Sequence, residues 1–487
     1  MKKEKEDNAY LTIYLALCIT LVLSLCLTLI EGVRRNGARL EAECVTEIGL
    51  QSILAEYHRE LFYQYNLFAI DSSYGTMLPG KANTERHLEQ YIERNLNLDD
   101  VFLDRFLYRD FLGLFADEVS LTKVSVLTDG GGAVFRRRAV EAVQDDVGLA
   151  LLEEMQEWLR VIEINGLEHR DIEAEKSELD AEIEEYDGME IDMGEEEDPY
   201  IFTVDNPTDR LESRKGEGIL KLVLEEDSEI SSNVIDSEGL IGDRMSTDRI
   251  NRGNMSLPTL SEAEQLTERF FFQEYLLRYM GHYGEENDED ALRYQIEYLV
   301  AESDSDAENL RTVANRICGI REAANTLYLF SDSEKRMEAE LVSQLACDLA
   351  MVPELAPVLE AAILLGWAYA ESIYDVKTLL SGGRVPLIKD SSNWHYDLSG
   401  ALQGDLTDSD GNGSGMAYED YLRIFMMCTE RDTLTTRAMN MVEADMRRTP
   451  GNSAFRLDGC YDCLEAWVRI KSSHDFDFEI TRQRSYD

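Results

Sequence analysis

A run of oxygen-bearing side chains near the C-terminal end has the residue types and the spacing of a calcium-binding loop. It has the sequence DSDGNGSGMAYE and spans residues 408–419. In such a loop, oxygens at positions 1, 3 and 5 contact the ion, a glycine at position 6 allows a sharp turn, and a bidentate glutamate at position 12 closes the site. The helical segment YEDYLRIFMM would carry that glutamate. The predicted calcium ligands are Asp408, Asp410, Asn412, Ser414 and Glu419.

Other features of this segment fit a polar hairpin without a bound ion. Gly415 stands where paired loops carry an aliphatic residue, the preceding segment WHYDLSGALQG is a weak helix, and no second loop occurs in the sequence. A single loop of this kind would bind calcium with the weak affinity of extracellular modules. We therefore expect that the protein requires no cofactor. If the loop binds an ion, its residue types and spacing indicate calcium.

Catalysis has no comparable signal in the sequence. The six histidines show no metal-ligand spacing, and the motifs of serine hydrolases, zinc proteases and cysteine enzymes are missing. The glycines at 130–132 lack the pattern of a phosphate-binding loop. Cys460 and Cys463 form a CxxC pair with no second pair, which favours a local disulfide or two separate thiols over zinc. We expect no catalytic residues and no enzymatic activity.

The charge of the chain limits its partners. The sequence holds 97 acidic side chains against 47 lysines and arginines, a formal net charge of −50. Because like charges repel, we expect neither nucleic acid nor an anionic lipid surface to bind the large domain. With 44% hydrophobic residues the chain can still bury substantial cores, and its length suggests two or three domains.

The apolar run at 10–30 is either a signal peptide or a membrane anchor, and the answer determines on which side of a membrane the rest of the chain lies. It has the sequence YLTIYLALCITLVLSLCLTLI, 21 residues without a formal charge, enough for a helix to span a hydrocarbon core of about 30 Å. A signal peptide has a shorter apolar region that ends in small residues, whereas here Glu31 follows directly. We therefore predict a membrane anchor. Three lysines before it and three arginines soon after it leave its orientation open.

The predicted helix continues beyond the membrane span. Apolar residues recur at steps of three and four as far as Tyr65, which would make one rod about 80 Å long. This stripe comprises Leu40, Cys44, Glu47, Leu50, Leu54, Tyr57 and Leu61, with Glu47 as its polar exception. The pattern then predicts a turn region at 71–81, a helix at 84–95, a strand at 119–129 and a helix at 134–162.

The middle of the chain is strongly acidic. Residues 171–198 hold 15 acidic side chains against one lysine, a density that cannot pack a core. We expect a loose linker there, with ILKLVL at 219–224 as a short strand. From Ser261 on, start signals and helical spacing predict a series of helices. The uncharged run at 361–370 has only ten residues and predicts a buried helix rather than a second span.

The predicted fold class is mostly α with minor β (α+β). A single transmembrane helix continues into a long extracytoplasmic helix, and a mainly helical body follows. The predicted divisions are a cytoplasmic tail at 1–9, the transmembrane helix at 10–30, a membrane-proximal α+β region at 31–166, an acidic, partly disordered linker at 167–258, a helical domain at 259–400, and a C-terminal region at 401–487 with the EF-hand-like loop and a terminal strand.

Several blocks of the sequence carry a resemblance. They include LQSILAEYHRELFYQYNLFAID, NPTDRLESRKGEGILKLVL, NRICGIREAANTLYLFSDSEKRMEAE and ILLGWAYAESIYDVKTLLSGGRVPLIK. In their order they resemble an uncharacterised family of Gram-positive membrane proteins encoded among tight-adherence (Tad) pilus genes. The N-terminal block is similar to TadE-like pseudopilins, in which the transmembrane helix ends in an Ile-Glu type of dipeptide before a basic turn. Here that dipeptide is Ile30 and Glu31.

The resemblance implies a single-pass protein of the cell membrane with its N-terminus inside and its body outside. It also implies a minor pseudopilin-like subunit or assembly factor of a Tad or type IV-related pilus or secretion apparatus. In that role, Glu31 and the stripe from Leu40 to Leu61 would contact other subunits, so the expected partners are the membrane and those subunits. The alternative function is a calcium-responsive surface adhesin or sensor.

Overall fold

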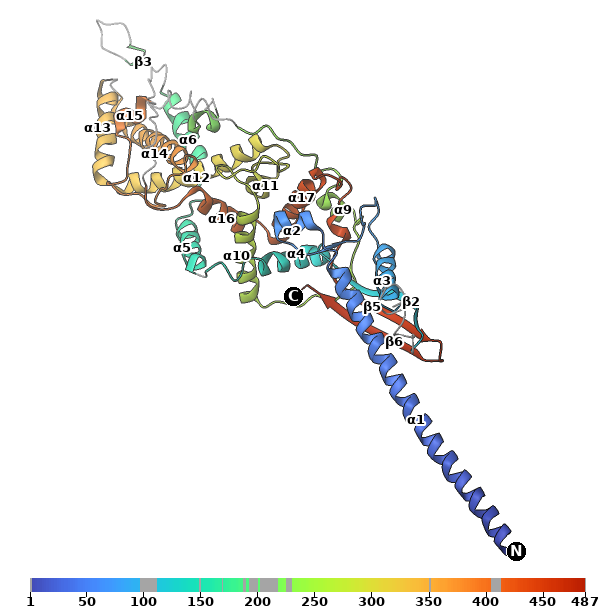
Figure 1. Cartoon of the computed structure of the whole chain (residues 1–487). Helices are drawn as coiled ribbons and strands as arrows, with labels where there is room; N and C mark the ends of the chain where they lie inside the picture. Colours follow the sequence, from blue (N-terminus) through green and yellow to red (C-terminus); the bar gives the residue numbers. More distant parts are fainter. Residues whose placement is uncertain are drawn as a thin grey trace. The chain divides into compact units, whose positions relative to one another are not determined.

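The computed structural model of this protein describes its residues in ten stretches. These are 2–96, 112–148, 150–168, 170–186, 190–191, 200–201, 218–224, 230–349, 352–403 and 413–486. The described chain is mainly helical, with one antiparallel sheet and one short strand pair, which confirms the predicted α+β class (Figure 1). It separates into two units. Unit 1 comprises Met1–Arg138, Arg244–Thr259 and Thr449–Asp487, and unit 2 comprises Ala139–Asp243 and Leu260–Arg448.

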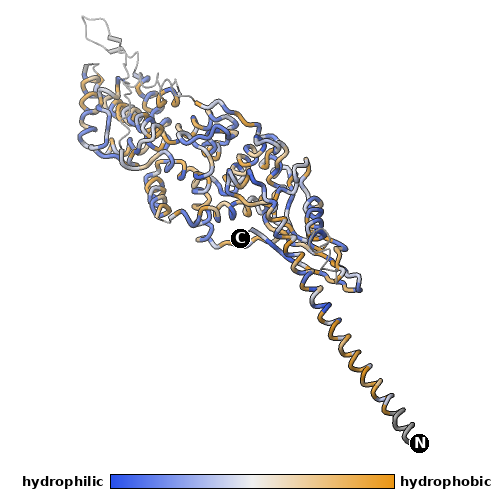
Figure 2. Tube along the Cα trace, in the orientation of Figure 1, coloured by the Kyte–Doolittle hydropathy of each residue, from blue (hydrophilic) through white to orange (hydrophobic). Residues whose placement is uncertain are grey.

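Helix α1, Lys2–Leu54, opens unit 1 and has two different halves. From Leu11 to Ile30 every side chain is exposed, and this half is predominantly apolar on all sides, as Figure 2 shows. Beyond it, one face of the same helix is buried. The buried residues of that face are Ala38, Ala42, Val45, Leu50 and Ile53. The chain therefore carries, near its N-terminus, an apolar helix long enough for a membrane anchor or a signal sequence.

The predicted continuation of this helix to Tyr65 is wrong, because α1 ends at Leu54. A separate helix, α2 (Arg59–Tyr65), begins after His58. The His58 Nδ1 accepts a hydrogen bond from the Leu61 amide at 3.1 Å and so caps α2. Apolar residues keep their helical spacing across the break, and for that reason the pattern alone does not locate it.

The sheet of unit 1 is organised around its longest C-terminal strand. Its strands are β1 (Ile70–Asp71), β2 (Leu114–Val126), β5 (Cys460–Ser472) and β6 (Asp477–Ser485). Both β2 and β6 pair with β5 along its length, and β1 pairs with its start, all antiparallel. In this register Val468 of β5 is opposite Val119 on one side and Ile480 on the other. The strand predicted at 119–129 is confirmed over 119–126 as part of β2, while its last residues lie beyond the strand.

The core of unit 1 lies between one face of this sheet and the helices α1 and α3 (Lys81–Leu96), which confirms the helix predicted at 84–95. Alternate residues of β5 are buried, as expected of a strand with one face in the core. These residues are Leu464, Ala466, Val468 and Ile470. Gly49 of α1 lets α3 approach closely, because a Cβ there would lie 3.1 Å from side-chain atoms of Leu88 and Ile92.

A short stretch from the middle of the sequence also belongs to unit 1. Asn254 lies beside β2: its amide donates to the Val124 carbonyl at 3.0 Å, and its Oδ1 accepts from the Val124 amide at 2.9 Å. The Gly253 amide donates to Asp129 Oδ1 at 2.8 Å. A Cβ on Gly253 would lie 2.1 Å from the Asp129 carboxylate, so only glycine fits there.

Unit 2 consists mainly of helices. They are α5 (Ala150–Ile164), α6 (Ile172–Glu184), α8 (Ile219–Val223), α10 (Glu262–Tyr279), α11 (Gln295–Ala301), α12 (Asp306–Ser331), α13 (Ser333–Leu349), α14 (Ala356–Leu380), α15 (Leu398–Gln403), α16 (Tyr418–Cys428) and α17 (Arg431–Arg448). Ser261 starts α10 with a capping box, as its sequence predicts. The apolar helix Pro353–Leu380 is 72% buried over its most apolar part, which confirms a buried helix at 361–370.

Three expectations need correction or extension. The helix predicted at 134–162 is two helices, α4 (Asp129–Glu141) and α5, because the chain leaves the helix before Gly148. The strand predicted at 219–224 is the helix α8. The acidic segment contains the helix α6 and the strand pair of β3 (Glu190–Ile191) and β4 (Tyr200–Ile201). Helix α9 (Ile241–Ser246) lies where the chain passes from unit 2 into the Arg244–Thr259 stretch of unit 1.

Replacing Leu464 by alanine tests whether the buried face of the sheet stabilises unit 1. Leu464 is fully buried on β5, so Leu464→Ala should lower the free energy of unfolding by about 2–5 kcal/mol. Thr481→Ala on the exposed face of β6 is the matched control, with an expected change within about 0.5 kcal/mol. The measurement is urea unfolding of the full chain in detergent. Equal effects of the two substitutions would contradict this core.

Candidate functional site

The half of α1 beyond the apolar span has an exposed apolar face opposite its buried one. Val33, Leu40 and Ile48 are 74%, 64% and 44% exposed. Together with neighbouring small or apolar residues they form one stripe at steps of three and four, which is the spacing of one helix face. We call it the exposed stripe, and it consists of Ile30, Val33, Gly37, Leu40, Cys44 and Ile48. It continues the apolar surface of the span without a break.

The stripe that the sequence predicts divides into a buried part and an exposed part. Leu50 and Leu61 are buried, and Leu54 packs against the same core as Leu50. Tyr57 packs edge-on against Phe62 at a centroid distance of 5.5 Å. This part of the stripe therefore belongs to the interior of unit 1 and is not available to another subunit.

The rest of the predicted stripe faces outward. Leu40 and Cys44 are exposed, and both belong to the exposed stripe. Glu47 forms an ion pair with Arg484 of β6, which explains a carboxylate among apolar residues. Periodicity locates the helix, but it cannot tell which of its residues the sheet covers.

Glu31, the predicted assembly residue, is exposed. It precedes Ala38 by seven residues and Ala42 by eleven, so it lies on the same helix face as the buried residues but beyond the start of the core. A charge at this point marks the end of the apolar span, and its face is directed away from the exposed stripe.

The predicted calcium ligands fall in two groups. Asp408, Asp410 and Asn412 lie outside the described residues. Ser414 is exposed, and Glu419 lies in the first turn of α16, half-buried, with a carboxylate oxygen 3.6 Å from Arg423. Of the five predicted ligands, these two are the ones that the structure describes.

Glu419 instead approaches a histidine and a glutamate that lie more than 130 residues earlier. The ligand atoms of His282, Glu285 and Glu419 all lie within 4.8 Å of one another. His282 is buried, and Gly284, with a φ of 93°, lets the chain turn so that His282 and Glu285 bond each other's backbones. Among the histidines, the HxxE spacing of His282 and Glu285 is the sequence signal that could have pointed to this group.

Four buried charged side chains of unit 2 neutralise one another. Arg321 and Asp375 are fully buried, and the Arg321 Nε donates to Asp375 Oδ2 at 2.9 Å. Lys389 pairs with Glu371, which also accepts from the His395 amide at 2.9 Å. This network fixes the segment after α14 onto α12 and α14. Because its charges are matched by partners, we assign it a structural role.

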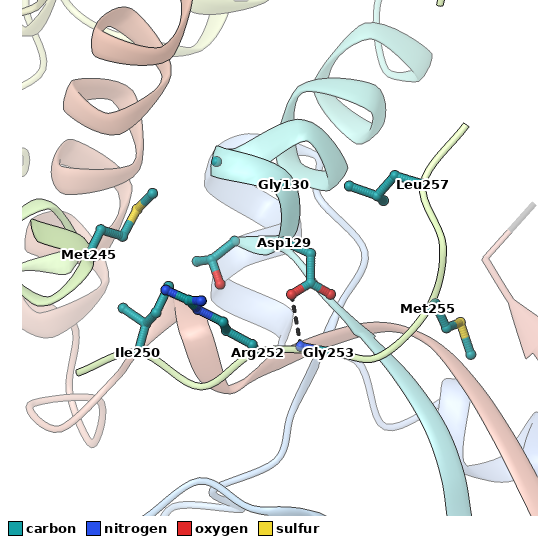
Figure 3. Close-up of a pocket in the computed structure, with 10 residues that line it drawn as sticks. Asp129, Gly130, Met245, Ile250, Arg252, Gly253, Met255 and Leu257 are labelled. Carbon is teal, nitrogen blue, oxygen red and sulfur yellow. Dashed lines mark hydrogen bonds between the residues drawn. The ribbon is translucent and has the colours of Figure 1, made fainter. Parts of the chain in front are cut away.

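A pocket of about 360 Å³ lies in unit 1 beside the three glycines at the start of α4. Figure 3 shows Asp129 bonded to Gly253, with Met245 and Leu257 on opposite sides of it. The other lining residues are Thr128, Gly130, Gly131, Ile250, Arg252 and Met255. Gly130 to Gly132 have φ between 63° and 81°, a left-handed turn rather than a phosphate-binding loop. The lining is mainly apolar and offers no acid–base pair.

The carboxyl group of Asp290 in unit 2 lies near a second carboxyl group, that of Asp445. Burial, and secondarily the charge of Asp445, raises the pKa of Asp290 to about 7. Asp445 accepts hydrogen bonds from the Ala291 amide and from Gln295 Nε2, both at 2.6 Å, and these hold it next to Asp290. Arg448 and a hydrogen bond from Asn287 act in the opposite direction. The Asp290 carboxyl therefore titrates near neutral pH, which makes the stability of unit 2 sensitive to pH.

Comparison with known proteins gives one match. The model of a family of unknown function (DUF5702) matches residues 199–472, which is more than half of the chain. No curated protein and no solved structure matches.

The raised pKa of Asp290 gives a pH prediction. The folded state holds this proton up to about pH 7, whereas the unfolded state releases it near pH 4, so stability falls as the pH rises between these values. From pH 5.5 to 7.5, the free energy of unfolding of Asp290→Asn should gain about 1 kcal/mol relative to the unmodified chain, after allowance for solvent screening. The measurement is urea unfolding at each pH. Glu289→Gln, on the exposed neighbour, should give no such gain, and a gain shared by both variants would contradict the assignment.

Proposed function

This chain belongs to the family of unknown function DUF5702, and from its own geometry we propose that it is a membrane-anchored structural or assembly component, minor pseudopilin-like, of a Tad or type IV-related pilus or secretion apparatus. Its N-terminus lies inside the cell membrane in this proposal, and its body lies outside. The chain performs no catalysis. Its partners are the membrane and other subunits of the apparatus.

The observation that supports this proposal is the double role of α1. Over Leu11–Ile30 the helix is exposed and apolar on all sides, a surface that lipid accommodates and water does not. The same helix then enters the core of unit 1 through Ala38 and Ala42. No hinge separates the two parts, because α1 is continuous from Lys2 to Leu54. A subunit built in this way holds its folded unit directly against the membrane.

The exposed stripe supports a contact with a second helix. Leu40, Cys44 and Ile48 lie beyond the span yet remain apolar and exposed, although α1 buries its opposite face. Apolar side chains at steps of four and seven are the pattern that packs against a neighbouring helix. In this proposal the neighbour is the anchor helix of another subunit, packed from Ile30 up to Ile48.

Glu31 has a different part in this proposal. It lies on the face that leads into the core and not on the exposed stripe, at the level where the apolar span ends. A carboxylate at that edge can pair with the N-terminal amine or a basic side chain of a neighbouring span. It would thereby set the axial register between two anchors, while the exposed stripe supplies the apolar contact.

A calcium-responsive surface adhesin or sensor is the second candidate function. The observation that favours it is the position of Glu419, which stands at the start of α16 with a partly exposed carboxylate, as the last ligand of the predicted calcium loop requires. The two proposals are compatible, since one concerns α1 and the other concerns unit 2.

Cysteine crosslinking in native membranes tests the exposed stripe. In a Cys44→Ser background, Leu40→Cys should form disulfide-linked adducts on mild oxidation, because this position faces the neighbouring helix. Arg39→Cys is the matched control, since Arg39 is 69% exposed but lies off the stripe. An adduct of twice the mass identifies a second copy, and mass spectrometry identifies any other subunit. Equal yields from the two positions would contradict the stripe as an assembly surface.

Charge reversal tests Glu31. We expect Glu31→Lys to leave membrane insertion unchanged and to lower the Leu40→Cys crosslinking yield several-fold, because the register between spans is lost. Glu43→Lys, farther along α1, serves as a charge-matched control and should lower the yield less. An unchanged yield with Glu31→Lys would remove its proposed role.

A further inference from the structure

We infer that His282, Glu285 and Glu419 of unit 2 form a binding site for a divalent transition-metal ion of the zinc or manganese class. The inference stands on their geometry and is independent of the proposed function. It assigns His282 and Glu285, for which the sequence suggested no role, and it gives Glu419 a different partner set from the predicted calcium loop.

The distances fit one ion after small side-chain movements. The three ligand atoms lie within 4.8 Å of one another, whereas ligands held about 2.1 Å from one ion lie about 3–4 Å apart. His282 is only 4% exposed and is fixed in place. The side chains of Glu285 and Glu419 are 75% and 41% exposed, so they are free to rotate toward it. One rigid imidazole and two adjustable carboxylates can therefore close on an ion.

The Nε2 atom of the His282 imidazole carries a lone pair that a metal ion can accept. The Nδ1 of His282 lies 3.0 Å from the Tyr283 carbonyl oxygen, which can only accept a hydrogen bond, so Nδ1 carries the proton of the neutral ring. Nε2 then has a free lone pair and lies 4.0 Å from Glu285 Oε2, too far for a hydrogen bond. Metal-binding histidines are commonly oriented in this way, with the other ring nitrogen donating to a backbone carbonyl.

A buried carboxylate next to these residues gives independent support. Glu297 is fully buried, and its Oε1 accepts from the Tyr283 amide at 2.9 Å and from the Tyr418 hydroxyl at 2.7 Å. These two donors belong to the residues directly beside His282 and Glu419. Glu297 therefore links the two segments that carry the ligands and holds them at a fixed separation.

The second oxygen of Glu297 has no hydrogen-bond partner in the described part of the chain. A buried carboxylate with an unpaired oxygen is costly unless positive charge lies near it. His282 is within electrostatic reach of Glu297. A metal ion on the Nε2 of His282 would add positive charge near Glu297.

The ligand types select the class of metal. Calcium takes oxygen ligands, whereas imidazole nitrogen suits zinc and other first-row transition metals. With one imidazole and two carboxylates, the site favours zinc or manganese over calcium. The predicted calcium loop needs the same Glu419 carboxylate, so the two ions would compete for it. Bound metal would join the turn at 282–285 to the start of α16.

Metal titration of the full chain tests the inference. After chelator treatment in detergent, Zn²⁺ or Mn²⁺ alone is added, and binding is followed by calorimetry and by the rise in Tm. We expect a single site of 1:1 stoichiometry. Glu285→Gln, on an exposed side chain that cannot affect folding strongly, should weaken binding at least tenfold, and His282→Ala should abolish it.

Two control variants distinguish this site from diffuse surface binding and from the predicted calcium loop. Asp288→Asn removes a nearby exposed charge that is not a ligand and should leave the dissociation constant unchanged. Asp408→Asn removes the first residue of the predicted calcium loop and should likewise leave zinc binding unchanged. Equal weakening by Glu285→Gln and Asp288→Asn would mean diffuse surface binding and overturn the site. Binding of calcium alone, lost with Asp408→Asn, would overturn it in favour of the loop.

Discussion

The structure depends on one helix that must suit two environments. Over Leu11–Ile30, α1 is exposed and predominantly apolar, and this part is long enough for a membrane anchor or a signal sequence. From Ala38 to Ile53, one face of the same helix is buried, because α3 and the sheet cover it. Gly49 shows how tight this contact is, since even one added carbon would press on Leu88 and Ile92. The apolar part of α1 and the folded unit are thereby joined by one continuous helix.

This constraint also explains why the C-terminal strands pack against α1. The buried face of α1 needs a sheet, and the strands that supply most of it, β5 and β6, come from the last residues of the sequence. The Tyr486 hydroxyl donates to the Leu54 carbonyl at 2.7 Å, which ties the C-terminal end to the end of α1. Unit 1 is therefore assembled from three stretches of the sequence, which alternate with the two stretches of unit 2, and its sheet requires the strands β5 and β6 of the third stretch.

Local pattern predicts the elements well and their assembly poorly. The span, the strand at 119–129, the start of α10 at Ser261 and the buried α14 all follow from periodicity, length and capping, which act over a few residues. The pairing of Val119 with Val468 does not, because it joins residues 349 positions apart. The same limit applies to the site: DSDGNGSG is visible as a local motif, whereas the approach of Glu419 to His282 appears only in the fold. The break after Leu54 escapes prediction since the apolar spacing continues across it.

In the proposed function, α1 anchors a folded body on the outer side of the membrane. Protease access to a C-terminal tag on intact protoplasts tests this topology most directly, because the tag follows β6 and so reports the location of unit 1. We predict loss of the tag from intact protoplasts, while a cytoplasmic marker protein stays whole. Protection of the tag until the protoplasts are lysed would place the body in the cytoplasm and contradict the proposed role in a surface apparatus.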